Sequence, residues 1–234
     1  MSSSLAALRQ QLAELLEGPR LGGAGLATGV PALDALLAGG GMPRGRLTEV
    51  VGARGSGKTT FVRRVVEETV ARGLWVAYVD AARTLAPRDW AHLSEGDGVW
   101  MIRPRDAARG AWCADVLLRS GAFALVVLDG APPLPHRVAL RLVGLAHEKD
   151  AALVVLGDEG GGSRLAGALR LAVSLAPGRR IAIAVEKGGT RQRVEVSCAI
   201  DMARRLCAHP AVPDRRGVGT AGRTGRTRRA GRAG

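Results

Sequence analysis

One short segment, GARGSGKTT at residues 52–60, constrains the fold of this chain more than any other. An apolar run at residues 46–51 precedes it, and residues 59–73 have the pattern of a helix. Its glycines and its Lys-Thr pair fit the pattern G-x-x-x-x-G-K-[ST], in which backbone N–H groups turn inward around phosphate oxygens at the start of a helix. The order strand, phosphate-binding loop and helix predicts an α/β domain.

The loop predicts binding of ATP or ADP together with Mg²⁺. Lys58 would reach the β and γ phosphates, and the hydroxyl of Thr59 would ligate Mg²⁺. Asp129 ends the apolar run at residues 124–130, where a Walker B aspartate would hold the hydration shell of the ion. The sequence suggests no other metal. The residues expected to contact the nucleotide are Gly52, Arg54, Gly55, Ser56, Gly57, Lys58, Thr59 and Thr60.

The middle of the chain alternates apolar runs with amphipathic segments. Continuous apolar runs are typical of strands whose sheet is covered by helices on both faces. Near the C-terminus, three strand-like segments follow one another with short turns, which indicates an antiparallel edge. We therefore predict a mostly parallel sheet flanked by helices, with an antiparallel edge. The expected strands are 46–52, 75–80, 124–130, 151–158, 169–176, 180–187 and 191–200, and the further expected helices are 107–121 and 136–150.

The two ends of the chain differ from this middle. Residues 1–25 are expected to form a helix and a linker, residues 26–208 the core domain, and residues 209–234 a disordered tail rich in Arg and Gly. The leucines of the first segment lie on one face of the helix, which docks either on another protein chain or on its own core. These positions are Leu5, Leu8, Leu12, Leu15 and Leu16.

Charge and cysteine content bear on partners and location. The net charge is +13, and seven arginines lie in residues 215–234, so the tail either binds DNA non-specifically or keeps the end of the chain in solution. The candidate DNA-binding residues are Arg164, Arg223, Arg226, Arg228 and Arg229. Three scattered cysteines, no secretory signal and no long apolar run lead us to expect a cytoplasmic protein with no membrane segment.

Several segments resemble the core of the RecA family. The first, residues 26–60, carries a TG-x-x-x-LD run from Thr28 to Asp34, three glycines at 39–41, and Glu49 before the loop. Further similar segments are residues 75–87, 117–134 and 168–189, so that the resemblance extends from residue 26 to about residue 200. It implies a RecA-like P-loop NTPase core.

The chain departs from the RecA pattern at the positions that hydrolyse ATP. In that family a glutamate follows two residues after the aspartate of the second strand and polarises the attacking water, whereas Ala82 stands here. General-base assistance is typically worth about 10²–10⁴-fold in rate. The family's γ-phosphate-sensing glutamine corresponds to Asp158, and either Asp158 or Glu159 is a candidate for a replacement base. Trp90 either replaces the family's adenine-stacking tyrosine or packs in the core.

The segments matching the RecA DNA-binding loops are also short. Arg164 and Arg170, near the second of them, either contact phosphates or lie on a solvated helix face. A RecA core with these departures is similar to the ImuA subfamily, which is implicated in SOS-induced translesion synthesis. That resemblance implies a nucleoid-associated adaptor with weak or no ATPase activity. The implied partners are RecA, an inactive Y-family polymerase homologue of the ImuB type and, indirectly, an error-prone replicative-type polymerase; self-association is also open. Two alternatives are an active DNA-dependent ATPase of the recombinase or mediator type and a nucleotide-independent DNA-binding protein.

Overall fold

The computed structural model describes residues 24–90, 93, 98–158, 167–178 and 180–197. The expected N-terminal helix with its five leucines and the basic tail lie outside these residues, as do Glu159, Arg164, Cys198 and Cys207. The helices of the described part are α2 (Pro31–Asp34), α3 (Lys58–Ala71), α4 (Pro87–Trp90), η2 (Ala107–Arg109), α5 (Gly110–Ser120) and α6 (His136–Glu148). Its strands are β1 (Leu47–Val51), β2 (Val76–Asp80), β3 (Val99–Ile102), β4 (Leu125–Asp129), β5 (Ala152–Gly157), β6 (Leu169–Ala176), β7 (Arg180–Lys187) and β8 (Arg193–Ser197).

The strands form one mixed sheet in the order β3-β2-β4-β5-β1-β6-β7-β8. Neighbours from β3 to β6 are parallel, whereas β7 pairs antiparallel with both β6 and β8. This confirms the predicted α/β fold with an antiparallel edge. Strand β3 was not predicted, because its four residues are only partly buried or exposed and form no long apolar run.

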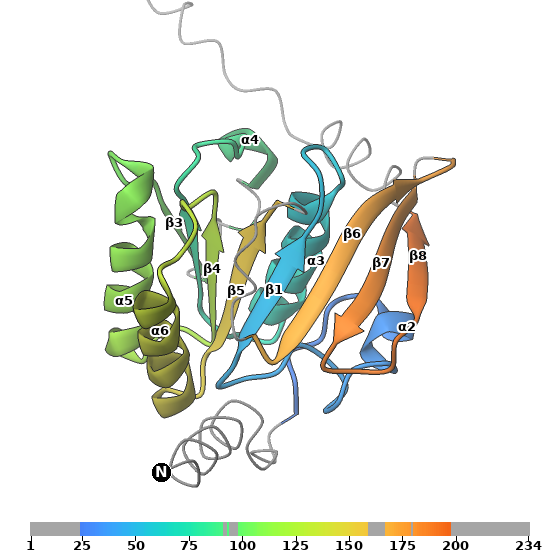
Figure 1. The fold of residues 1–234 in the computed structure, drawn as a ribbon, viewed down its shortest axis with the longest axis horizontal. Coiled ribbons are helices and arrows are strands. Elements are labelled where there is room, and N and C mark those ends of the chain that lie inside the picture. The colour runs from blue at the N-terminus through green and yellow to red at the C-terminus, as the bar shows by residue number, and fades with distance from the viewer. Residues whose placement is uncertain (1–23, 91–92, 94–97, 159–166, 179, 198–234) are drawn as a thin grey trace, which may run out of the picture.

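Helices cover both faces of the sheet, which explains why its central strands are mostly apolar. Helices α5 and α6 pack side by side on one face, and α3 covers the other (Figure 1). All five residues of β1, β2 and β4 are buried. The core is therefore two apolar layers, one on each side of the sheet.

Two local features position the site within this fold. The TG-x-x-x-LD run closes on itself, because the hydroxyl of Thr28 donates to Oδ1 of Asp34 at 2.7 Å. This contact fixes the chain that leads toward β1. At the other end of the sheet, the register pairs Asp80 with Asp129 and Val51 with Gly157. The last residues of β1, β2, β4 and β5 therefore lie together at the carboxyl ends of the strands, where ligands of open α/β sheets bind.

Candidate nucleotide-binding site

The phosphate-binding loop joins β1 directly to α3 and depends on glycine at both of its ends. Gly57, the N-cap of α3, has φ of 95°, and a Cβ there would lie 2.7 Å from Cδ1 of Ile181. A Cβ on Gly52 would lie 2.2 Å from the carbonyl oxygen of Val173. Larger residues would thus displace the loop from strands β6 and β7. The local geometry explains why the motif requires glycine at these two positions.

Lys58 is the first residue of α3, and its ammonium group points back across the loop. It donates to the carbonyl oxygen of Gly52 at 2.5 Å and to that of Gly157 at 2.8 Å. It also forms an ion pair of 3.0 Å with Oδ1 of Asp158. The lysine therefore lies between the ends of β1 and β5, where an incoming phosphate would meet it.

Asp129 ends β4 and is almost fully buried. Its Oδ2 accepts a hydrogen bond of 2.7 Å from the hydroxyl of Tyr78, a residue of β2. Burial raises the pKa of Asp129; the Tyr78 hydrogen bond opposes this rise, whereas the nearby charges of Asp80 and Asp158 add to it. The site therefore concentrates carboxylates, a charge distribution that favours a divalent cation between Asp129 and Thr59.

An open cavity of about 770 Å³ lies over this edge of the sheet. Of the predicted contact residues, Arg54, Gly55, Lys58, Thr59, Thr60 and the predicted Mg²⁺ ligand Asp129 line it. Gly52, Ser56 and Gly57 do not line the cavity. The remaining lining residues are Arg63, Ala82, Thr84, Leu85, Ala86, Asp89, Trp90, Gly130 and Asp158.

These residues fit a nucleotide phosphate with Mg²⁺. The cavity has the size of a small-molecule site. The donor set combines loop N–H groups at a helix N-terminus, an ammonium group and a hydroxyl beside a carboxylate. A group of three or more possible metal ligands of the His, Cys, Asp or Glu type does not occur within the described ranges.

Ala82 lies where the water-activating carboxylate was expected. Its methyl group lines the cavity next to Gly130, and a Cβ on that glycine would lie 2.2 Å from Cβ of Ala82. The nearest acidic residue in sequence, Asp80, is 1 % exposed and is already fully engaged. It accepts from the backbone N–H groups of Thr84 at 2.9 Å and Leu85 at 3.2 Å and from Nε of Arg103 at 2.9 Å. Asp80 therefore holds the turn after β2.

Trp90 is packed rather than free to stack on a base. It is 4 % exposed, and its ring centre lies 5.2 Å from that of Tyr78 in an edge-to-face arrangement. The guanidinium of Arg63 lies over the same ring at 5.8 Å from its centre. Trp90 also lines the cavity. The packing interpretation of this residue is therefore the better supported of the two.

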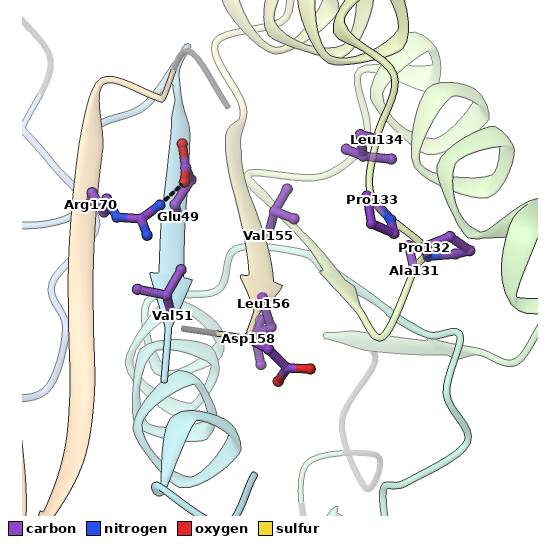
Figure 2. Close-up of a pocket in the computed structure, with 11 residues that line it drawn as sticks. Glu49, Val51, Ala131, Pro132, Pro133, Leu134, Val155, Leu156, Asp158 and Arg170 are labelled. Carbon is purple, nitrogen blue, oxygen red and sulfur yellow. Dashed lines mark hydrogen bonds and ion pairs between the residues drawn. The ribbon is translucent and has the colours of Figure 1, made fainter. Parts of the chain in front are cut away.

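A smaller, partly apolar pocket adjoins the main cavity (Figure 2). Asp158 lines both, and the small pocket also contains Pro132, Pro133 and the buried Glu49. Arg170 is bound to Glu49 and donates to Oε2 of Glu186 at 2.8 Å. Arg170 lies within β6, and because two carboxylates engage its guanidinium, a phosphate contact would require these ion pairs to break.

Tyr78 is the functional candidate that sequence reasoning missed. It lies within an apolar strand, where its ring looks like ordinary core, and its partner is 51 positions away. A polar hydroxyl in an otherwise apolar run was the available signal, since buried tyrosines usually bond to a partner.

The geometry agrees with what comparison with known proteins shows. The model of the RecA N-terminal domain family matches residues 16–141, more than half of the chain. The RecA protein of Lactobacillus acidophilus is 39% identical over 114 residues, which cover 48% of this chain and 31% of that protein. RecA of Frankia casuarinae is 37% identical and RecA of Streptomyces avermitilis 38% identical, each over 114 residues and 48% of this chain, with 33% and 30% of those proteins covered.

The matching segment therefore spans about a third of the length of these relatives. In the described part of the chain, the helices are too short or too polar for any of them to cross a membrane. The fold, the phosphate-binding loop and the family match agree, and the chain belongs to the RecA N-terminal domain family.

Proposed function

We propose that this protein is a RecA-like adaptor that binds ATP or ADP with Mg²⁺ but hydrolyses the triphosphate slowly or not at all. The observation that carries this proposal is Ala82: a methyl group lines the cavity beside Gly130, and Asp80 is held by three donors. A methyl group neither accepts a proton nor orients water. Hydrolysis in this site therefore lacks the general base that the family resemblance leads us to expect.

The loop would hold the phosphates, and Thr59 together with Asp129 would hold the ion. Backbone N–H groups of residues 52–60 and the ammonium of Lys58 would bind phosphate oxygens, while Thr59 and Asp129 would hold Mg²⁺. Tyr78 fixes the orientation of the Asp129 carboxylate through its hydroxyl. The bound ion would supply charge neutralisation of the phosphates.

The role we infer is accessory to DNA repair, of the ImuA type, during SOS-induced translesion synthesis. The family membership supports a role connected with recombination and repair. In this proposal the leucine face of residues 1–25 docks on RecA or on a second copy of the chain, and the tail at residues 209–234 contacts DNA. The core of residues 26–208 would also contact an ImuB-type polymerase homologue.

The rival function is an active DNA-dependent ATPase. One observation favours it: Asp158 lines the same cavity and lies 3.0 Å from the ammonium of Lys58. A carboxylate at that place is the described group best placed to replace the missing base. Titration with a fluorescent ATP analogue separates both functions from nucleotide-independent DNA binding, because only the first two give saturable binding that Lys58→Ala abolishes.

A pull-down from DNA-damaged cells tests the partner assignment. We expect the tagged full-length chain to recover RecA and polymerase subunits, identified by mass spectrometry. The paired substitution Leu8→Asp and Leu12→Asp should abolish recovery of RecA if the leucine face docks there. The control is Leu175→Asp, which makes the same type of substitution once, at a leucine that is 63% exposed on β6. Failure of the unmodified chain to recover RecA or polymerase subunits would refute the adaptor assignment.

A further inference from the structure

The ammonium of Lys58 has all its hydrogen-bonding capacity satisfied within the chain. A lysine has three N–H donors, and this one meets Gly52, Gly157 and Asp158 at 2.5, 2.8 and 3.0 Å. Two of these acceptors are backbone carbonyls at the ends of β1 and β5, so they cannot move away without disturbing the sheet. The third is a side chain that is 81% exposed. A terminal phosphate that takes up the third N–H donor of Lys58 therefore has to displace Asp158.

Asp158 makes the same kind of contact with Lys58 that a phosphate group would make. It presents an anionic oxygen to the ammonium, and it lines both cavities. Figure 2 shows its side chain among the residues of the smaller one. In phosphate-binding loops the lysine reaches the β and γ phosphates. The outer face of its ammonium group, meaning the side away from the backbone carbonyls, is the side that would meet the γ phosphate. The carboxylate of Asp158 occupies that outer face.

A second carboxylate adds to the negative charge at the same place. Asp158 is near enough to Asp129 for their charges to interact. A diphosphate places one charged group fewer beside these carboxylates than a triphosphate does. Like charges at short range repel one another even at a partly solvated site. The free-energy cost of this repulsion therefore falls mainly on the third phosphate.

We infer that Asp158 is an internal competitor of the terminal phosphate, and that it makes this site select a nucleoside diphosphate over a triphosphate. The inference rests on the proposed function, since it presupposes that the loop binds nucleotide. Asp158 acts as a specificity-determining residue: it lowers triphosphate affinity while leaving the loop that holds the inner phosphates unchanged.

Equilibrium titration of the full chain with fluorescently labelled ADP and ATP, in the presence of Mg²⁺, tests this inference. We expect the unmodified protein to bind the diphosphate more tightly. Asp158→Asn should tighten triphosphate binding by about tenfold and diphosphate binding by less than about threefold, since the site is exposed and screened by salt. Asp158→Glu keeps the charge and should keep the preference for ADP.

Asp150→Asn is the matched control. Asp150 precedes β5 whereas Asp158 follows it, and its carboxylate is likewise exposed and ion-paired, to Arg44 at 3.0 Å. This control should leave both affinities unchanged. Equal affinities for the two nucleotides, or an equal change of both in Asp158→Asn, would overturn the inference while leaving nucleotide binding itself intact. Absence of saturable binding to the unmodified protein and to Asp158→Asn would overturn the inference and the proposed function together.

Discussion

The ion pair between Glu49 and Arg170 links the strand that carries the phosphate-binding loop to its neighbour, and its loss should destabilise the whole domain. Glu49 lies opposite Arg170 in the register of β1 and β6, and it is 4% exposed. Arg170 donates to its carboxylate through Nη1. Replacing Arg170 with methionine keeps most of the apolar stem and removes the charge, so that the Glu49 carboxylate is left buried without its partner.

The expected cost follows from the burial of the two partners. Removing one member of a fully buried pair costs about 3–5 kcal/mol. The Arg170 side chain is 18% exposed beside an open pocket, where water replaces part of the lost interaction. We therefore expect Arg170→Met to lower the free energy of unfolding by about 2–3 kcal/mol at pH 8. Urea unfolding followed by tryptophan fluorescence measures this quantity.

The pH dependence of the loss has a defined sign. Burial raises the pKa of Glu49, and Arg170 opposes that rise, so removal of Arg170 should raise the pKa further. A carboxyl whose folded pKa exceeds its unfolded value stabilises the fold below the unfolded pKa, and this contribution is lost as pH rises through the folded pKa. The destabilisation by Arg170→Met should therefore be smaller at pH 5 than at pH 8.

Two further variants test whether the ion pair between Glu49 and Arg170 stabilises the domain. Glu49→Gln combined with Arg170→Met removes the buried charge and should recover part of the lost stability. Arg180→Met breaks a matched but exposed pair with Glu195, 3.3 Å apart, and should cost less than about 1 kcal/mol. A loss below about 1 kcal/mol for Arg170→Met at pH 8, with no pH dependence and no recovery in the double variant, would refute a stabilising role for this pair.

Three other predictions concern single residues. Tyr78→Phe removes the hydroxyl that donates to Asp129, and should lower the free energy of unfolding by about 1–3 kcal/mol in urea; an unchanged value would show that the bond contributes nothing. Gly57→Ala forces a Cβ to within 2.7 Å of Ile181 at φ of 95° and should abolish binding of labelled nucleotide; retained affinity would contradict the loop geometry. Burial would raise the pKa of Asp115, but its arginine partners lower it overall, so the stability that Asp115 contributes is present above the unfolded pKa and lost as pH falls. Asp115→Asn should therefore lower the thermal midpoint by a few degrees at pH 7 and less at pH 3, and equal losses at both would refute this.

Much of the fold could be predicted from local patterns. Buried parallel strands carry their own signal as continuous apolar runs, and the glycines of the phosphate-binding loop report a backbone that larger residues cannot adopt. Strand β3 is apolar, but it is only four residues long and Trp100 is 55% exposed at the edge of the sheet, so it gives a weaker signal. The order of strands in the sheet depends on crossover connections, which no local pattern encodes.

The candidate site was predictable where a local motif or the family resemblance marks a position, as in the phosphate-binding loop and at Asp129, but the contacts between distant residues were not. Lys58 and Asp158 are separated by 100 positions, and Glu49 and Arg170 by 121. Their pairing depends on which strands become neighbours and in what register. The sequence position of Arg170 shows its charge, but it does not show that Glu49 and Glu186 pair with its guanidinium.

The central claim is that this site binds nucleotide without efficient hydrolysis, because Ala82 supplies no base. Steady-state ATP turnover by the full chain, measured with and without single-stranded DNA, tests it most directly, with Lys58→Ala as the reference for background. The account predicts turnover indistinguishable from that reference, or at most slightly above it, under conditions where labelled ATP binds saturably. Robust DNA-stimulated turnover that Lys58→Ala abolishes would contradict it.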